Sequence, residues 1–147
     1  MSFEARRVRL SVPRDTASLG PVRAVTVELA RQLGFAATDV DKIEMAVDEA
    51  CANAVLYQRG AARAFDISLE ATDGALVATV LDGGLAFDFE GATAPGLANR
   101  LACCEFGGLG LQIIQRFMDE VTYEHRDGAG NVLTMTKFLP DGPNSAN

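Results

Sequence analysis

Two polar side chains, Glu49 and Asn53, stand four residues apart in the stretch DEACANAV. A helix turns by about 100° per residue, so this spacing would place both on one helix face, beside the apolar stripe. A glutamate can accept a proton, and an asparagine offers a neutral oxygen that suits Mg²⁺. The same spacing also fits the ordinary polar flank of an amphipathic helix.

A second group follows the apolar stretch ALVATVL, where Asp82 and Gly83 lead into Gly84. A carboxylate at the end of a strand can accept a hydrogen bond from an exocyclic amine such as that of adenine. A glycine at position 84 would let a flat ring approach the backbone closely. A strand-ending turn accounts for the same residues, because Asp-Gly is common in turns.

A third group is the glycine-rich segment from Gly107 to Leu111, which leads into a helical pattern. Glycines at the start of a helix leave backbone N–H groups open to phosphate oxygens, and the helix dipole adds to that attraction. The segment is not a Walker motif, because no Lys-Ser or Lys-Thr follows. It is not a dinucleotide fingerprint either, since it follows a loop and not a strand. A plain glycine-rich helix start is the alternative.

The elements that must position these groups follow from the spacing of apolar residues. Helical spacing predicts helices from near Pro21 to Gly34, from a cap at Thr38 or Asp39 to about Tyr57, and from Leu109 to Met118. Alternating apolar residues predict strands over residues 8–12, 65–70, 75–81, 121–125 and 132–139. Residues 82–108 show no periodicity, as is typical of a functional lid or a disordered loop.

This order of elements predicts an α+β fold, because most of the strands are joined by tight turns. We expect a two-layer sandwich in which a mixed, mostly antiparallel sheet carries the helices on one face. A chain of 147 residues fits one domain. We assign residues 1–139 to that domain and residues 140–147 to a flexible tail.

The composition narrows the classes of partner. The formal net charge is −7, and an acidic surface disfavours nucleic acid and anionic lipid. The sequence contains no long apolar run, and its first residues lack the apolar core of a signal peptide, so we expect a cytoplasmic protein with no membrane partner. The three cysteines, Cys51, Cys103 and Cys104, form no C-x-x-C pair, which argues against a disulfide framework or a zinc site.

The three groups, in this order, resemble the motif boxes of the GHKL ATPase superfamily. Within it, the chain is similar to the RsbW/SpoIIAB-type anti-sigma factor serine kinases. The resemblance covers about residues 7–139 and is carried by RLSVP, KIEMAVDEACANAV, VLDGGLAFD and GGLGLQIIQRFMDEV. The last stretch is the most specific, since its Met-Asp-Glu-Val ending is typical of these kinases and not of histidine kinases.

The resemblance implies ATP and Mg²⁺ as cofactors. Asp82 would bind the adenine amine, with Gly84 beside the ring, and Asn53 would ligate Mg²⁺. The backbone amides of Gly108 and Gly110 would hold phosphates.

The resemblance also implies a catalytic residue and partners. Glu49 would be the general base that takes the proton of a substrate serine, and residues 85–106 would form an ATP lid. The substrate would be a small anti-anti-sigma antagonist of the STAS type, and the kinase would also bind a sigma factor. Arg23 matches a position that contacts both partners in the SpoIIAB-type members. A homodimer is a further expectation from the family.

The chain departs from the family at three positions. Tyr57 stands where a histidine is often found, and Phe106 where some members carry a lid arginine, for which Arg100 could substitute. Gly130-Asn131 replaces a frequent Gly-Thr. The first two departures keep open a non-catalytic nucleotide-binding module that sequesters a partner. A switch kinase that acts on a scaffold complex is a third alternative.

Overall fold

The computed structural model describes residues 5–56, 63–83, 108–126 and 130–140. The elements along the chain are β1 (Arg6–Pro13), a short 3-10 helix (Thr16–Ser18), α1 (Leu19–Leu33), α2 (Ala37–Leu56), β2 (Ala64–Thr72), β3 (Ala75–Asp82), α5 (Gly108–Phe117), β4 (Glu120–Arg126) and β5 (Gly130–Phe138). The predictions for Tyr57, Gly84, Arg100, Phe106, the lid and residues 141–147 fall outside the described residues.

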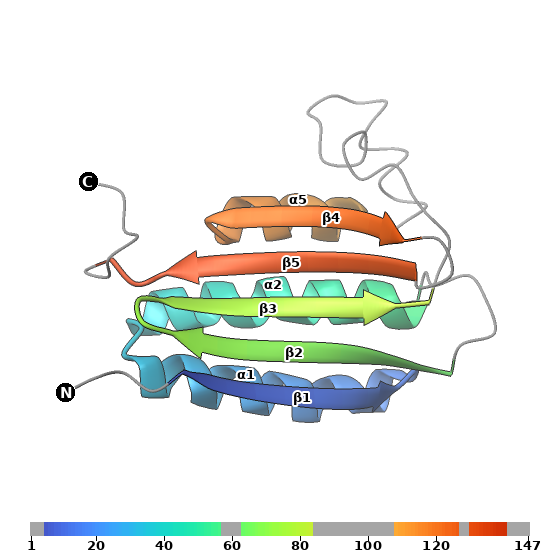
Figure 1. Ribbon diagram of the computed structural model, residues 1–147, viewed down its shortest axis with the longest axis horizontal. Coiled ribbons are helices and arrows are strands. Elements are labelled where there is room, and N and C mark those ends of the chain that lie inside the picture. The colour runs from blue at the N-terminus through green and yellow to red at the C-terminus, as the bar shows by residue number, and fades with distance from the viewer. Residues whose placement is uncertain (1–4, 57–62, 84–107, 127–129, 141–147) are drawn as a thin grey trace.

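The strands form one five-stranded sheet in the order β1-β2-β3-β5-β4. All four pairings between described strands are antiparallel. Figure 1 shows α1, α2 and α5 side by side against one face of this sheet. The α+β sandwich is therefore confirmed, with a sheet that is antiparallel throughout its described pairings.

The order of the last two strands explains why no parallel pair forms. The connection from β3 through α5 brings β4 back in the same direction as β3. The chain then returns as β5, which inserts between them and pairs antiparallel with both. Because β5 lies between β3 and β4, β4 forms the edge of the sheet and does not pair with β3.

The core lies between the sheet and the helices. Alternate residues of β2 are buried toward the helices, starting with Phe65, Ile67 and Leu69. On α2 the predicted apolar stripe is buried throughout: Val40, Ile43, Val47, Ala50 and Ala54. Because α2 packs against α1 on one side and α5 on the other, its remaining faces meet two different helices. This central position allows α2 to serve both the core and a site.

The helix boundaries show where local signals succeed and fail. Gly34 ends α1 as predicted, with φ 93° and an N–H that donates to the carbonyls at the helix end. The structure starts α2 at Ala37, so the prediction that Thr38 or Asp39 caps it is wrong. Both residues lie in the first turn, where the charge of Asp39 still suits the helix dipole.

Candidate functional site

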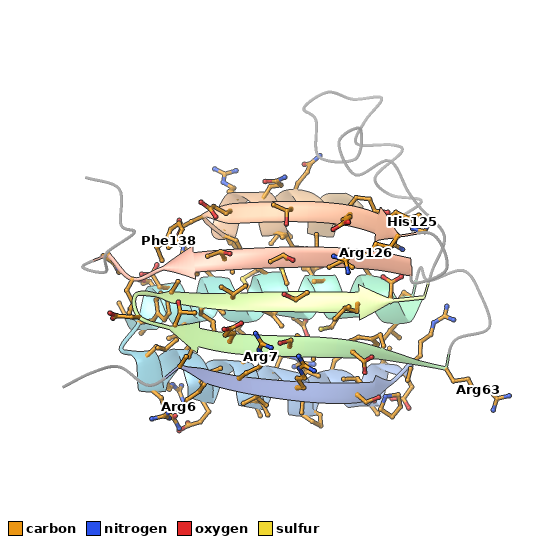
Figure 2. The ribbon with its side chains drawn as sticks, viewed as in Figure 1. Arg6, Arg7, Arg63, His125, Arg126 and Phe138 are labelled. Atoms are coloured by element: carbon orange, nitrogen blue, oxygen red, sulfur yellow. The ribbon has the colours of Figure 1, made fainter. Side chains whose placement is uncertain are left out.

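Three chain segments that carry the predicted motifs end or begin at the same end of the sandwich. They are the C-terminal part of α2, the end of β3 and the start of α5 (Figure 1). Figure 2 places His125 and Arg126, the last residues of β4, at this end as well. Antiparallel topology produces this gathering, because β3 and β4 run in one direction and β5 starts where they finish.

Glu49 and Asn53 occupy the flank of α2 that sequence spacing predicted. Both side chains are half-buried, while the neighbouring Ala50 and Ala54 are buried in the core. They therefore border the apolar interior without being enclosed by it. This position allows a carboxylate and an amide to act at the edge of a site.

Gly110 in α5 lies directly against Glu49. A methyl group on Gly110 would come within 2.5 Å of Oε2 of Glu49, so a side chain at this position would displace the carboxylate. The first and third sequence groups are thus in contact, across the α2–α5 packing. Gly108 is the first residue of α5, which confirms a glycine-rich helix start. The sequence did not predict that Gly110 makes room for Glu49.

The surroundings of Glu49 make its carboxylate a better proton acceptor. Burial raises the pKa of Glu49 above its ordinary value, because the charged form loses hydration. The negative charge of neighbouring Asp48 raises the pKa further. A carboxylate with a raised pKa is a stronger general base than one at its ordinary value.

Asp82 is the last residue of β3 and is held by a polar network that sequence analysis missed. Nδ2 of Asn131 donates to Oδ1 of Asp82 at 2.9 Å. Oδ1 of Asn131 accepts from the hydroxyl of Tyr123 and lies 3.0 Å from Nδ1 of His125. A hydroxyl facing an amide oxygen must donate, so these partners fix the orientation of the Asn131 amide. The only sequence signal was the departure from Gly-Thr.

Gly130 explains why Asn131 reaches Asp82. The sheet register pairs Asp82 with Asn131 directly across β3 and β5. Gly130 has φ 94°, and a methyl group there would lie 1.9 Å from the carbonyl oxygen of Asp82. Only glycine allows this conformation and this approach of the two backbones. The start of β5 is thereby held against the end of β3.

The described residues fit a nucleotide better than a metal cage. Among them, no group of three or more His, Cys, Asp or Glu side chains could hold a metal ion. Mg²⁺ needs no such group beside a nucleotide, since phosphates and water supply most of its ligands and one protein oxygen, such as that of Asn53, can complete them. The carboxylate at the end of β3 and the helix start at Gly108 suit an amine and phosphates, respectively.

A sequence profile of the histidine kinase-like ATPase domain matches residues 12–137. The chain belongs to the histidine kinase-like ATPase domain family. Serine-protein kinase RsbW of Halalkalibacterium halodurans is 32% identical over 136 residues, covering 90% of this chain and 83% of that protein. Serine-protein kinase RsbW of Bacillus subtilis is 27% identical over 147 residues, covering 95% and 89%. These relatives and the domain family confirm the predicted RsbW-type serine-protein kinase and its use of ATP.

Solved structures share the fold of this ATPase-family kinase. The RsbU and RsbW domains of a Mycobacterium tuberculosis protein superpose with a TM-score of 0.66 at 19% identity, over 91% of this chain and 32% of that longer chain. The SiaB–SiaC complex of Pseudomonas aeruginosa gives 0.58 at 12% identity, over 90% and 89%. Of the helices described in the kinase, none combines the length and apolar character needed to cross a bilayer.

Proposed function

We propose that this kinase phosphorylates a serine of a small STAS-type antagonist in the cytoplasm, using Mg·ATP. It also binds a sigma factor, which the unphosphorylated antagonist displaces. The observation that carries the proposal is the setting of Glu49: half-buried, in contact with Gly110, and with a raised pKa. A carboxylate in that setting is suited to accept the proton of a serine hydroxyl.

Each assigned residue has a role that its position supports. The carboxylate of Asp82, oriented by Asn131, accepts a hydrogen bond from the adenine amine. The backbone N–H groups at Gly108 and Gly110 bind phosphate oxygens at the start of α5. Asn53 contributes an oxygen to Mg²⁺, one turn of α2 after Glu49.

ATP supplies the γ-phosphoryl group, and Mg²⁺ neutralises charge on the phosphates. The protein's own contribution is mainly position and charge, because phosphoryl transfer needs little covalent chemistry from the enzyme. Glu49 orients the serine hydroxyl and accepts its proton as the oxygen attacks.

The proposed protein partners are those that the family resemblance implies, and they agree with the net charge of the chain. A net charge of −7 supports protein partners over direct contact with nucleic acid or an anionic membrane. The regulation would be a partner switch, in which phosphorylation of the antagonist releases it and leaves the kinase free to bind the sigma factor. A homodimer of the kinase remains part of this proposal.

Transfer from labelled ATP to candidate antagonists tests the function, with two variants that separate chemistry from binding. Glu49→Gln keeps the shape of the side chain and removes the base, so it should bind Mg·ATP normally. It should lose single-turnover transfer by about 10²-fold, the lower end of general-base effects, since a loose transition state needs less base assistance. Asn53→Ala should weaken both Mg·ATP binding and transfer, because it removes a metal ligand.

The same experiment distinguishes the alternatives. Normal ATP binding by the wild type with no transfer to any antagonist would support a module that acts by sequestration. Transfer to an antagonist without measurable sigma-factor binding would support a switch kinase that acts on a scaffold complex. Full transfer by Glu49→Gln would leave the kinase in place and remove Glu49 as its base.

A further inference from the structure

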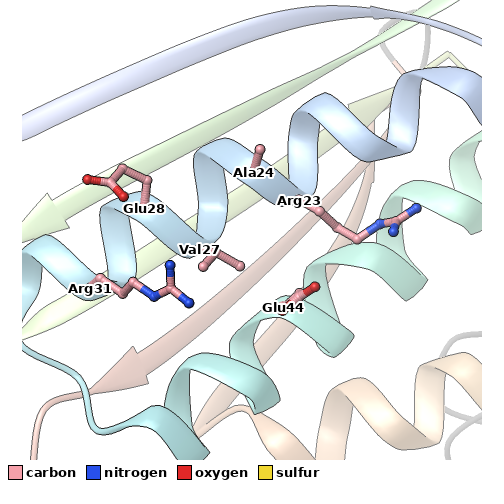
Figure 3. A pocket seen from close by; sticks show the side chains of 6 residues that line it. All are labelled: Arg23, Ala24, Val27, Glu28, Arg31 and Glu44. Atoms are coloured by element: carbon pink, nitrogen blue, oxygen red, sulfur yellow. The ribbon is translucent and has the colours of Figure 1, made fainter.

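An ion pair joins α1 to α2 immediately beside the proposed base. Nε of Arg23 lies 2.8 Å from Oδ1 of Asp48. This oxygen is buried and accepts no hydrogen bond from the described residues. Arg23 is close enough to pair with its charge, although the N–H group of Arg23 does not point at it as a hydrogen-bond donor would. Figure 3 shows the Arg23 side chain reaching from α1 toward α2. Asp48 therefore depends on Arg23 to offset its charge.

Asp48 and Glu49 are consecutive residues of α2, so their side chains point about 100° apart around the helix. Asp48 faces α1, where it meets Arg23, and Glu49 faces α5, where it meets Gly110. The charge of Asp48 nevertheless contributes to the raised pKa of Glu49. A like charge at this range makes it harder for a carboxyl group to lose its proton, and a cation beside that charge reduces the effect.

We propose that Asp48 and Arg23 are positioning residues that set the strength of Glu49 as a base. Asp48 makes Glu49 hold a proton more tightly, and Arg23 limits that effect by pairing with Asp48. The role of Glu49 as the base rests on the proposed function, whereas the effect of Asp48 and Arg23 on the ionisation of Glu49 does not. An ion pair with its arginine 45% exposed contributes little to folding.

The same surface supplies matched controls. Arg23 lines a pocket of about 410 Å³ between α1 and α2, together with Ala24, Val27, Glu28, Arg31 and Glu44 (Figure 3). In the described part of the chain, Arg31 and Glu44 form no ion pair, while Glu28 accepts from Gln32. Arg31 is thus a cation of the same pocket that does not reach Asp48, and Glu44 is an acid of α2 that does not pair with α1.

Two helices and β3 pack against α2, and the only charged residue of β3 is Asp82, at its end. From α1 the charged groups are Arg23, Glu28 and Arg31, and only Arg23 contacts Asp48. The described part of α5 carries one charged residue, Arg116, which is exposed in its last turn, whereas Gly110 meets Glu49 in the first. Substitutions at Arg23 and Asp48 should therefore move the titration of Glu49 in opposite directions.

The test is a carboxyl ¹³C NMR titration of the kinase, with the Glu49 signal assigned by its loss in Glu49→Gln. Asp48→Asn should shift the Glu49 midpoint to lower pH, since a like charge is removed. Arg23→Gln should shift it to higher pH, because Asp48 is no longer neutralised. Glu44→Gln and Arg31→Gln, each removing the same type of charge nearby, should leave the midpoint at its wild-type value.

Two results would overturn the proposal. One is an Asp48→Asn midpoint equal to that of Glu44→Gln, and the other is an Arg23→Gln midpoint that fails to rise above that of Arg31→Gln. The pH profile of single-turnover transfer distinguishes failure of this proposal from failure of the proposed function. If the NMR midpoints shift as expected while the acidic limb of the rate profile stays still, the charge coupling stands and Glu49 is not the base.

Discussion

At the scale of single residues, the contact between Gly110 and Glu49 limits where the carboxylate of this proposed base can lie. A glycine in a helix costs stability relative to alanine, so its presence in the first turn of α5 needs a local reason. That reason is the carboxylate of Glu49, which occupies the space of the missing methyl group. The flexible end of the glutamate, and not the backbone, would have to yield to a larger residue.

We expect Gly110→Ala to lower phosphotransfer while the protein stays folded. The new methyl group would displace Oε2 of Glu49, and a misplacement of about 1 Å can reduce a rate by about 10²-fold. Folding should not suffer, because alanine is favoured in helices by about 1 kcal/mol over glycine. Single-turnover rates and urea denaturation of the same preparations measure the two effects.

Gly20→Ala is the matched control, since Gly20 lies in α1 with no atom within 4 Å of the added methyl group. It should gain stability and retain the wild-type rate. Equal rates for Gly110→Ala and Gly20→Ala would show that the Gly110 contact does not position Glu49.

At the scale of elements, the pairing of β3 with β5 places Asn131 across from Asp82. The sequence pattern of either strand does not predict this pairing. Alternation of apolar and polar residues indicates which face of the sheet a residue occupies, but not which residue lies opposite it. The tight approach at Gly130 and the register together orient the Asp82 carboxylate. The adenine assignment of Asp82 therefore depends on β5 as much as on β3.

Asn131→Leu should weaken ATP binding by about 10-fold or more. It removes a hydrogen bond to a carboxylate, and such bonds contribute about 1.5–3 kcal/mol. The loss should be smaller for purine riboside triphosphate, which lacks the exocyclic amine that Asp82 would bind. Calorimetric titration with both nucleotides measures the difference.

Two companion variants make the result specific. Tyr123→Phe keeps the bond between Asn131 and Asp82, so it should lose less affinity than Asn131→Leu. Asp82→Asn should lose ATP binding, because an amide donor would face the adenine amine. Wild-type ATP affinity in Asp82→Asn would contradict the adenine assignment.

At the scale of the whole molecule, partial burial of Glu49 links its chemistry to stability. Its pKa is raised in the folded protein, so folding favours the protonated form. The resulting stabilisation is complete below the ordinary carboxyl pKa and disappears as the pH rises through the raised pKa. At neutral pH the charge on Glu49 therefore lowers the stability of the folded protein.

Glu49→Gln should accordingly raise the free energy of unfolding at neutral pH. The gain over wild type should shrink as the pH falls through the raised pKa of Glu49, since the wild-type carboxyl group is then also uncharged. Urea denaturation at several pH values measures the difference, with Glu44→Gln as the control for removing one carboxylate from α2. A gain that does not change with pH would indicate a cause other than this ionisation.

Most of the secondary structure, and the family, could be predicted from the amino-acid sequence alone. Apolar periodicity predicted the three described α-helices and the five described strands, but not the short 3-10 helix, and the resemblance of four sequence stretches to a kinase family implied an ATP-using serine kinase. These features are local: a helix stripe, an alternation or a glycine before a helix lies within a few consecutive residues. The start of α2 was missed because the choice of capping residue among close candidates depends on the backbone that precedes it.

Which residues of different elements contact one another depends on the tertiary structure. The insertion of β5 between β3 and β4, the network from Asp82 to Tyr123 and the contact of Gly110 with Glu49 all join residues far apart in the chain. So does the ion pair of Arg23 with Asp48. Sequence periodicity shows which face a side chain occupies, whereas strand register and helix packing determine its neighbour. The basicity of Glu49 arises from burial and from those neighbours, so it could not be predicted before the chain was folded.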